Sequence, residues 1–264
     1  MLSSTFSIFP GIGPRLEKYL WRTGVLTWED FLSAEKIPGF SSRRKLLLDG
    51  YVIDAMTALR AGNILYFQPL LGPGGLWKLW DSLGPDAVCM DIETDGKSPE
   101  TGAVTVAGFY SNGEYRPYVC GNNLTQDAVQ KEIEDARLLV TFAGSTFDIP
   151  YLKAFYPELR VDAPHLDLCP AGHRAGLKGG LKKVEKLVGI ARAGEVEGIG
   201  GYQAVLLWQA HMRGREGALD TLIAYNREDT ENLHALAGKI YGMLSDISGF
   251  PEFAGGRLAA VSSK

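Results

Sequence analysis

The sequence predicts an α/β fold preceded by a small all-helical module. Helical patterns at about 15–22 and 43–59, with a capped helix start at 27–30, indicate the module. The Gly-Pro-Gly-Gly segment at 72–75 is the clearest break in the chain, because such clusters mark turns and linkers. Strand-like runs then alternate with helical patterns, as in α/β domains. We expect a helical module over residues 1–68, an α/β domain over residues 69–248 and a loose tail over residues 249–264.

The α/β part begins with three apolar runs, at 87–92, 103–110 and 115–120, that predict antiparallel strands. The Asn-Gly pair at 112–113 is typical of a hairpin turn. The remaining patterns predict helices at 125–136 and 149–155, strands at 138–142 and 165–168, and long helices at about 200–213 and 217–243.

Composition is that of an ordinary globular protein, with 264 residues, 45% of them hydrophobic and 22% charged. The three cysteines form no C-x-x-C pair, so neither a disulfide framework nor a zinc site is favoured. No segment approaches the roughly 18 apolar residues of a membrane helix, and no secretory leader pattern opens the chain. We expect a cytoplasmic protein with no membrane partner. The net charge of −4 argues against strong non-specific binding of nucleic acid by the whole surface.

Two carboxylates, Asp91 and Glu93, close the apolar run at 87–90. The period of a strand places both side chains on the same face. Buried like charges are costly unless a cation offsets them, and Mg²⁺ is held by one or two carboxylates together with substrate phosphates. The pair therefore indicates a site for phosphate chemistry.

Two further acids stand among apolar residues. Asp229 interrupts the apolar stripe of the last long helix, four residues after Tyr225, and Asp148 follows a predicted buried strand. Each has a plain structural interpretation when taken alone. Asp229 could lie at the edge of the stripe, and Asp148 could be a helix N-cap.

Taken together, Asp91-x-Glu93, Asp148 and Tyr225-x-x-x-Asp229 resemble the motifs of DEDD exonucleases of the ribonuclease H fold, in the tyrosine-bearing subgroup. The segments at 91–96, 141–150, 165–168 and 225–233 look most like the YprB-type ribonuclease H-like exonucleases. The resemblance covers roughly residues 85–245 and implies a mixed sheet flanked by helices. One position departs from the pattern, because relatives commonly carry Asn where this chain has Ala143. This difference would affect how the substrate is held and not how the metal is bound.

The resemblance also implies a mechanism with two divalent ions, Mg²⁺ or Mn²⁺, about 4 Å apart at the scissile phosphate. Asp91 would bridge both ions, Glu93 and Asp229 would complete the ion nearer the nucleophile, and Asp148 would hold the second, directly or through water. The Tyr225 hydroxyl would orient the attacking water, because a phenol with a pKa of about 10 is a poor base at neutral pH. The implied activity is 3′-to-5′ release of nucleoside monophosphates from DNA or RNA. Asp167 is expected to have a structural hydrogen-bonding role.

Two regions could hold the nucleic acid. The basic segment at 173–192 includes Lys178, Lys182 and Lys183 and would form a phosphate track, although a solvated helix face explains it as well. Pro-Gly-Ile-Gly at 10–13 resembles the hairpin of helix-hairpin-helix modules. There Gly11 and Gly13 would present backbone N–H groups to phosphate, assisted by Arg15.

A weak second copy of this hairpin lies 28 residues further on and carries Ser41 where a glycine is expected. A simple helical turn or a protein-docking module remains the alternative for both copies. At the level of function the alternatives are a structure-directed endonuclease of the same fold and a catalytically silent nucleic-acid-binding protein.

Overall fold

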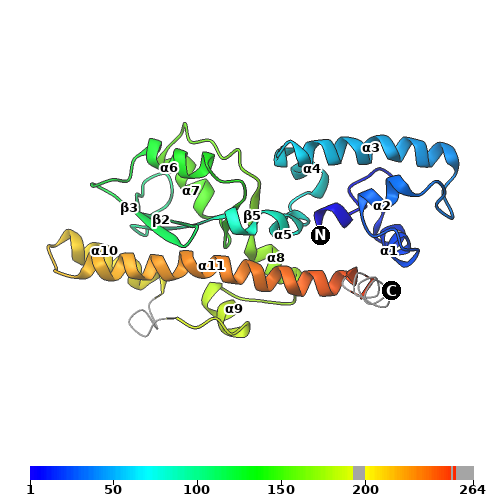
Figure 1. Ribbon diagram of the computed structural model, residues 1–264. Coiled ribbons are helices and arrows are strands. Elements are labelled where there is room, and N and C mark those ends of the chain that lie inside the picture. Colours follow the sequence, from blue (N-terminus) through cyan, green and yellow to red (C-terminus); the bar gives the residue numbers. More distant parts are fainter. Residues whose placement is uncertain (193–199, 251, 254–264) are drawn as a thin grey trace. The chain divides into compact units, whose positions relative to one another are not determined.

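The computed structural model describes residues 1–192, 200–250 and 252–253 (Figure 1). The chain forms two compact units, one made of Met1–Ser82 with the described residues from Tyr241 onward, the other of Leu83–Ile240. The first unit takes in more of the chain than the predicted module of residues 1–68. Trp77 packs against Tyr241, and Phe250 packs against Trp21. Of the tail expected over 249–264, residues 251 and 254–264 lie outside the described residues.

The first unit is helical, as predicted for its N-terminal part. It contains the 3₁₀ turns η1 (Leu2–Ser4), η2 (Ile64–Tyr66) and η3 (Leu76–Leu79) and the helices α1 (Pro14–Arg22), α2 (Trp28–Ser33), α3 (Ser42–Arg60) and α4 (Phe67–Leu71). Helix α5 (Trp80–Leu83) ends at the boundary of the unit. The core is aromatic: Phe6, Trp28, Phe31 and Phe67 are fully buried. Burial of such large side chains is the main stabilising contribution in a unit of this size.

The two hairpin copies have the same local structure. Gly11 and Gly39 both adopt a left-handed backbone, with φ of 73° and 79°. Residues 13 and 41 then serve as the N-caps of α1 and α3. The Ser41 hydroxyl accepts the N–H of Arg44 at 3.3 Å, whereas Gly13 has no side chain to do this for α1. The start of α1 is therefore left without a side-chain cap.

The second unit is built on a mixed five-stranded sheet in the order β3-β2-β1-β4-β5. Its strands are β1 (Val88–Thr94), β2 (Val104–Ser111), β3 (Glu114–Val119), β4 (Leu139–Thr141) and β5 (His165–Asp167). The pairs β1·β2 and β2·β3 are antiparallel, and β1·β4 and β4·β5 are parallel. The hairpin turn is at the predicted place, with positive φ at Asn112 and Gly113. The predicted mixed sheet flanked by helices, after a helical region, is confirmed.

The helical elements of this unit are η4 (Gly84–Asp86), α6 (Gln126–Glu134), α7 (Asp148–Phe155), α8 (Leu168–Arg174), α9 (Leu181–Leu187), α10 (Gly201–Met212) and α11 (Ala218–Ser248). Helix α11 continues into the residues assigned to the first unit and ends five residues beyond the predicted position 243. Among the described residues, the search for membrane-spanning helices finds none of sufficient length and apolarity.

Each face of the sheet is covered by a different set of helices. On one face Met90 and Ile92 of β1 pack with Ile133 of α6 and Leu152 of α7. On the other face Val106 of β2 packs with residues of α10 and α11, among them Trp208, Leu222 and Tyr225. Because side chains alternate along a strand, Asp91 and Glu93 face α10 and α11. The acids of β1 and the acid of α11 thus share one side of the sheet.

The loop between β4 and α7 places Asp148, and Asp167 shapes that loop. The Asp167 carboxylate accepts the backbone N–H groups of Ala143 at 2.8 Å and of Ser145 at 3.1 Å. It also accepts the N–H of Cys169 at 3.0 Å and so caps α8. The structural hydrogen-bonding role expected for Asp167 is confirmed. Ala143 itself adopts a left-handed conformation with φ of 61°.

Ala143→Asn should stabilise the protein by roughly 0.5–1 kcal/mol, because the left-handed backbone costs most L-residues about 1–2 kcal/mol and Asn tolerates it best among them. Urea denaturation measures the change. The matched control is Ala154→Asn in the last turn of α7, which should destabilise the protein by a few tenths of a kcal/mol at most, roughly the difference in helix propensity. A loss of stability in Ala143→Asn equal to that of the control would contradict the argument.

Candidate active site

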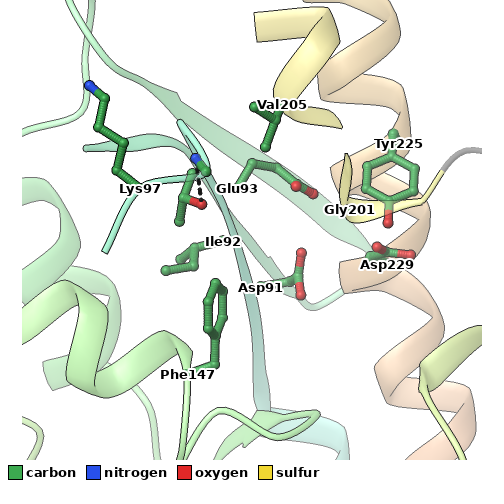
Figure 2. A pocket seen from close by; sticks show the side chains of 11 residues that line it. Asp91, Ile92, Glu93, Lys97, Phe147, Gly201, Val205, Tyr225 and Asp229 are labelled. Carbon is green, nitrogen blue, oxygen red and sulfur yellow. Dashed lines mark hydrogen bonds between the residues drawn. The ribbon is translucent and has the colours of Figure 1, made fainter. Parts of the chain in front are cut away.

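Three carboxylates converge on the α11 face of the sheet. Asp91 and Glu93 come from β1 and Asp229 from α11, and their ligand oxygens lie within 4.8 Å of one another. Figure 2 shows these side chains pointing toward one another beside Tyr225. Glu93 and Asp229 are buried, and Asp91 is partly exposed. The group is therefore dense in negative charge and open enough on one side to be reached.

Electrostatics make this group unstable without a positive partner. Burial first, and repulsion from Asp229 next, raise the pKa of Asp91 and that of Glu93 well above their ordinary values. The hydrogen bond from Asn226 opposes the rise of the Glu93 pKa. Several carboxylates this close retain their charges only if cations or donors compensate them.

Asn226 holds the two strand acids and is fully buried. Its Nδ2 donates to Asp91 Oδ2 at 2.9 Å and reaches Glu93 Oε1 at 3.5 Å, while its Oδ1 accepts from the Tyr115 hydroxyl at 2.8 Å. The amide fits because residue 108 on the neighbouring strand is glycine. A Cβ at Gly108 would lie 2.0 Å from Asn226 Oδ1. Neither Asn226 nor Gly108 was predicted as a site residue from the sequence, although Asn226 directly follows Tyr225 in the motif segment.

Arg192 was also missed as a site residue. Its Nη1 forms an ion pair with Asp229 Oδ1, and its Nε binds Glu185 Oε2 at 2.6 Å. Glu185 is 1% exposed. A guanidinium held in this way by a buried carboxylate supplies Asp229 with a fixed positive neighbour. A cation bound at the three carboxylates would share Asp229 with Arg192.

Asp148 lies near the strand acids in a different arrangement. It is buried, and its Oδ1 accepts the N–H of Ile92, the residue between Asp91 and Glu93, at 3.1 Å. It is outside the group of three whose oxygens lie within 4.8 Å. Burial raises the pKa of Asp148 to about 7, although the N–H of Ile92 opposes the rise. The helix N-cap is Phe147, so the plain interpretation of Asp148 as an N-cap is wrong.

Tyr225 is buried one helical turn before Asp229. Burial first, and the carboxylates of Asp229 and Glu93 next, raise the pKa of Tyr225 above its ordinary value. A phenol in this setting keeps its proton at neutral pH and can act as a hydrogen-bond donor.

A pocket of about 370 Å³ opens over these groups. A volume of this size is within the range of small-molecule sites. The pocket is lined by the acids and by other residues of β1, of the segment that follows β1, and of α10 (Figure 2). The lining residues are Asp91, Ile92, Glu93, Thr94, Gly96, Lys97, Phe147, Gly201, Val205, Tyr225 and Asp229.

The residues expected to hold nucleic acid separate into two groups. Lys178 and Lys183 are exposed around the start of α9, whereas the ammonium of Lys182 is buried 4.4 Å from the ring centroid of Tyr225. In the other unit, Gly11, Gly13 and Arg15 are exposed at the start of α1. Within the described residues of the second unit, Lys182 is the only one of these six residues that lies at the acidic cluster.

Comparisons with known proteins identify the class. A family described as the RNase_H superfamily matches residues 88–241, more than half of the chain, and the protein therefore belongs to the RNase H superfamily. No curated protein sequence matches the chain. A solved structure of the family B DNA polymerase from the hyperthermophilic archaeon Pyrobaculum calidifontis is similar, with 17% identity and a TM-score of 0.49 over 58% of this chain. The match covers 24% of the polymerase chain, so it spans about a quarter of that protein.

The predicted ribonuclease H-like fold is thereby confirmed, and its acidic cluster fits a divalent cation. RNase H-like nucleases use divalent metals. Asp91, Glu93 and Asp229 offer the hard oxygen ligands that Mg²⁺ and Mn²⁺ prefer. The raised pKa values of Asp91 and Glu93 reflect negative charge that a bound cation would offset.

Asn226→Ala should weaken binding of Mn²⁺ to the protein by roughly 10- to 100-fold, the usual effect of removing a group that orients metal ligands. Calorimetric titration with Mn²⁺ measures this directly. Asn232→Ala, six residues further along α11, is the matched control and should bind Mn²⁺ as the wild type does. Equal affinity in both variants would show that the Asn226 amide does not organise the ligands.

Asp148→Asn should stabilise the metal-free protein as pH rises. The folded-state pKa of about 7 exceeds the unfolded value of about 3.9, so the folded wild type binds more protons between these values and loses stability as pH increases through this window. In EDTA, the variant should match the wild type at about pH 3.9, the unfolded value, and exceed it near pH 8 by on the order of a few kcal/mol. Denaturation at both pH values is the measurement, and a variant that gains no stability relative to the wild type between them would refute the prediction.

Proposed function

We propose that the protein is a metal-dependent nuclease that releases nucleoside monophosphates from the 3′ end of DNA or RNA. The observation that carries this proposal is the convergence of Asp91, Glu93 and Asp229 in a chain of the RNase H superfamily. Tyr225 beside Asp229, and Asp148 beneath the strand acids, complete the set expected of the tyrosine-type DEDD subgroup and of YprB-type exonucleases.

The proposed cofactors are two Mg²⁺ or Mn²⁺ ions. When bound, such ions activate a water for attack on phosphorus and stabilise the charge on the leaving 3′ oxygen. Asp91, Glu93 and Asp229 would hold them, and Asp148 would contribute through water while it fixes the backbone between the strand acids.

The remaining groups would position the reactants. Tyr225 keeps its proton and would donate a hydrogen bond that orients the attacking water. Asn226 keeps both strand carboxylates directed at the pocket, and Arg192 limits the repulsion that Asp229 adds.

The nucleic-acid partner would be held through its phosphates. Lys178 and Lys183 are exposed and available for a phosphate track at the start of α9. In the first unit, Gly11, Gly13 and Arg15 surround the start of α1, where no side chain caps the helix and backbone N–H groups can receive a phosphate. This exposed helix start without a side-chain cap supports the helix-hairpin-helix proposal for the first hairpin copy.

A catalytically silent nucleic-acid-binding protein is the second candidate, favoured by the ion pair between Arg192 and Asp229. In such a protein Arg192 would be the permanent counter-ion of the cluster. Divalent-ion titration separates the two candidates, because a silent domain should bind no ion at Asp91, Glu93 and Asp229.

Incubation with 3′- and 5′-labelled oligonucleotides and Mg²⁺ or Mn²⁺ tests the proposal. We expect stepwise loss from the 3′ end as nucleoside monophosphates, and a decrease of roughly 10³-fold or more in Asp91→Asn, the scale of losing one member of a catalytic set. Asp127→Asn, an exposed acid of α6, should retain full activity.

Binding of the oligonucleotide without any loss from its 3′ end would contradict the exonuclease proposal. Internal nicks in a circular substrate would instead indicate the endonuclease alternative.

A further inference from the structure

Lys182 is the second residue of α9, and its ammonium lies over the ring of Tyr225, 4.4 Å from the centroid. The Nζ atom is buried although the residue as a whole is partly exposed, and it has no hydrogen-bond partner among the described residues. The charges acting on it include the carboxylates of Asp229 and Glu93. It is therefore a desolvated cation that faces the acidic cluster without binding it.

The neighbouring basic residues behave differently. Arg192 is already paired with Glu185 and Asp229. Lys183 is exposed, and its stem packs beside Gly179, where a Cβ would lie 2.7 Å from the Lys183 Cδ. Among the described cations at the cluster, Lys182 has a buried ammonium that forms no ion pair. The guanidinium of Arg192 also has a buried Nη2 without a hydrogen-bond partner, but two ion pairs hold it in place.

A buried ammonium without an acceptor is costly, because its three donors lose water and gain nothing in return. The interaction with the Tyr225 ring recovers only part of this loss. An acceptor that arrives with the substrate would use these donors, and phosphate oxygens are strong acceptors for lysine. From its position beside Tyr225, the Lys182 ammonium would reach the phosphate that reacts and not the phosphates further along the strand.

We propose that Lys182 is a catalytic residue that donates a hydrogen bond to a non-bridging oxygen of the phosphate being cleaved. This assignment rests on the proposed nuclease function and goes beyond a general phosphate track. In the reaction, the oxygen of water bonds to phosphorus and the water gives up a proton to solvent, the bond from phosphorus to the 3′ oxygen breaks, and the 3′ oxygen takes a proton from solvent. Lys182 keeps its proton throughout and stabilises the charge on the phosphoryl oxygen, which is greatest in the transition state.

Lys182→Met tests the proposal because it removes the ammonium and keeps an apolar stem of similar length. We expect kcat for release of the 3′ nucleotide to fall roughly 10²- to 10³-fold, as when one preorganised donor to a developing charge is lost. KM should change less than kcat. Lys182→Arg should recover part of kcat, and Lys131→Met, at an exposed lysine of α6, is the matched control, with kcat unchanged. A fall in kcat equal in both methionine variants would overturn the assignment.

A second measurement does not depend on turnover. Calorimetry with deoxyadenosine monophosphate and Mn²⁺ should show binding to the wild type that weakens at least roughly tenfold in Lys182→Met, the effect of losing one charge-assisted hydrogen bond. Binding of Mn²⁺ alone should stay as in the wild type. Equal affinity for the monophosphate in both proteins, or none in the wild type, would overturn the proposal. If the wild type cleaves nothing but shows this loss of binding, the phosphate contact stands and the nuclease function fails.

Discussion

The site depends on three carboxylates that the fold holds closer than like charges tolerate. Asp91, Glu93 and Asp229 present oxygens within 4.8 Å of one another, and their burial makes each charge more costly. A fold retains such an arrangement only with compensation. Asn226 and Arg192 provide part of it from within the chain. A divalent cation would supply the remainder, and this would link the stability of the site to its proposed chemistry.

The scaffold determines which side chains can take part. One face of the sheet is filled by apolar residues under α6 and α7, which leaves the alternate positions of β1 for Asp91 and Glu93 opposite α11. Gly108, the residue paired with Asp91 in the sheet, provides the space that the Asn226 amide needs. Small and polar residues far apart in the sequence therefore serve the same pair of carboxylates.

Much of this was visible in the sequence because it depends on local periodicity. The strand period places Asp91 and Glu93 on one face, and the helical stripe points Asp229 inward. Asn226 and Arg192 could not be assigned in this way. Their roles depend on which strand pairs with β1 and on where the chain after α9 returns, and periodicity contains neither. The left-handed backbone of Ala143 was hidden for a similar reason, since the residue that accepts its N–H, Asp167, belongs to another strand.

The most direct test of the central claim is a crystal of the protein soaked in Mn²⁺ and measured at the manganese absorption edge. The account predicts an anomalous peak within coordination distance of Asp91, Glu93 and Asp229, roughly 2.0–2.2 Å from their oxygens as for hard divalent ions. It also predicts that Arg192 remains bound to Glu185. A cluster without any manganese peak at saturating concentration, and with Arg192 as its sole cation, would contradict the account.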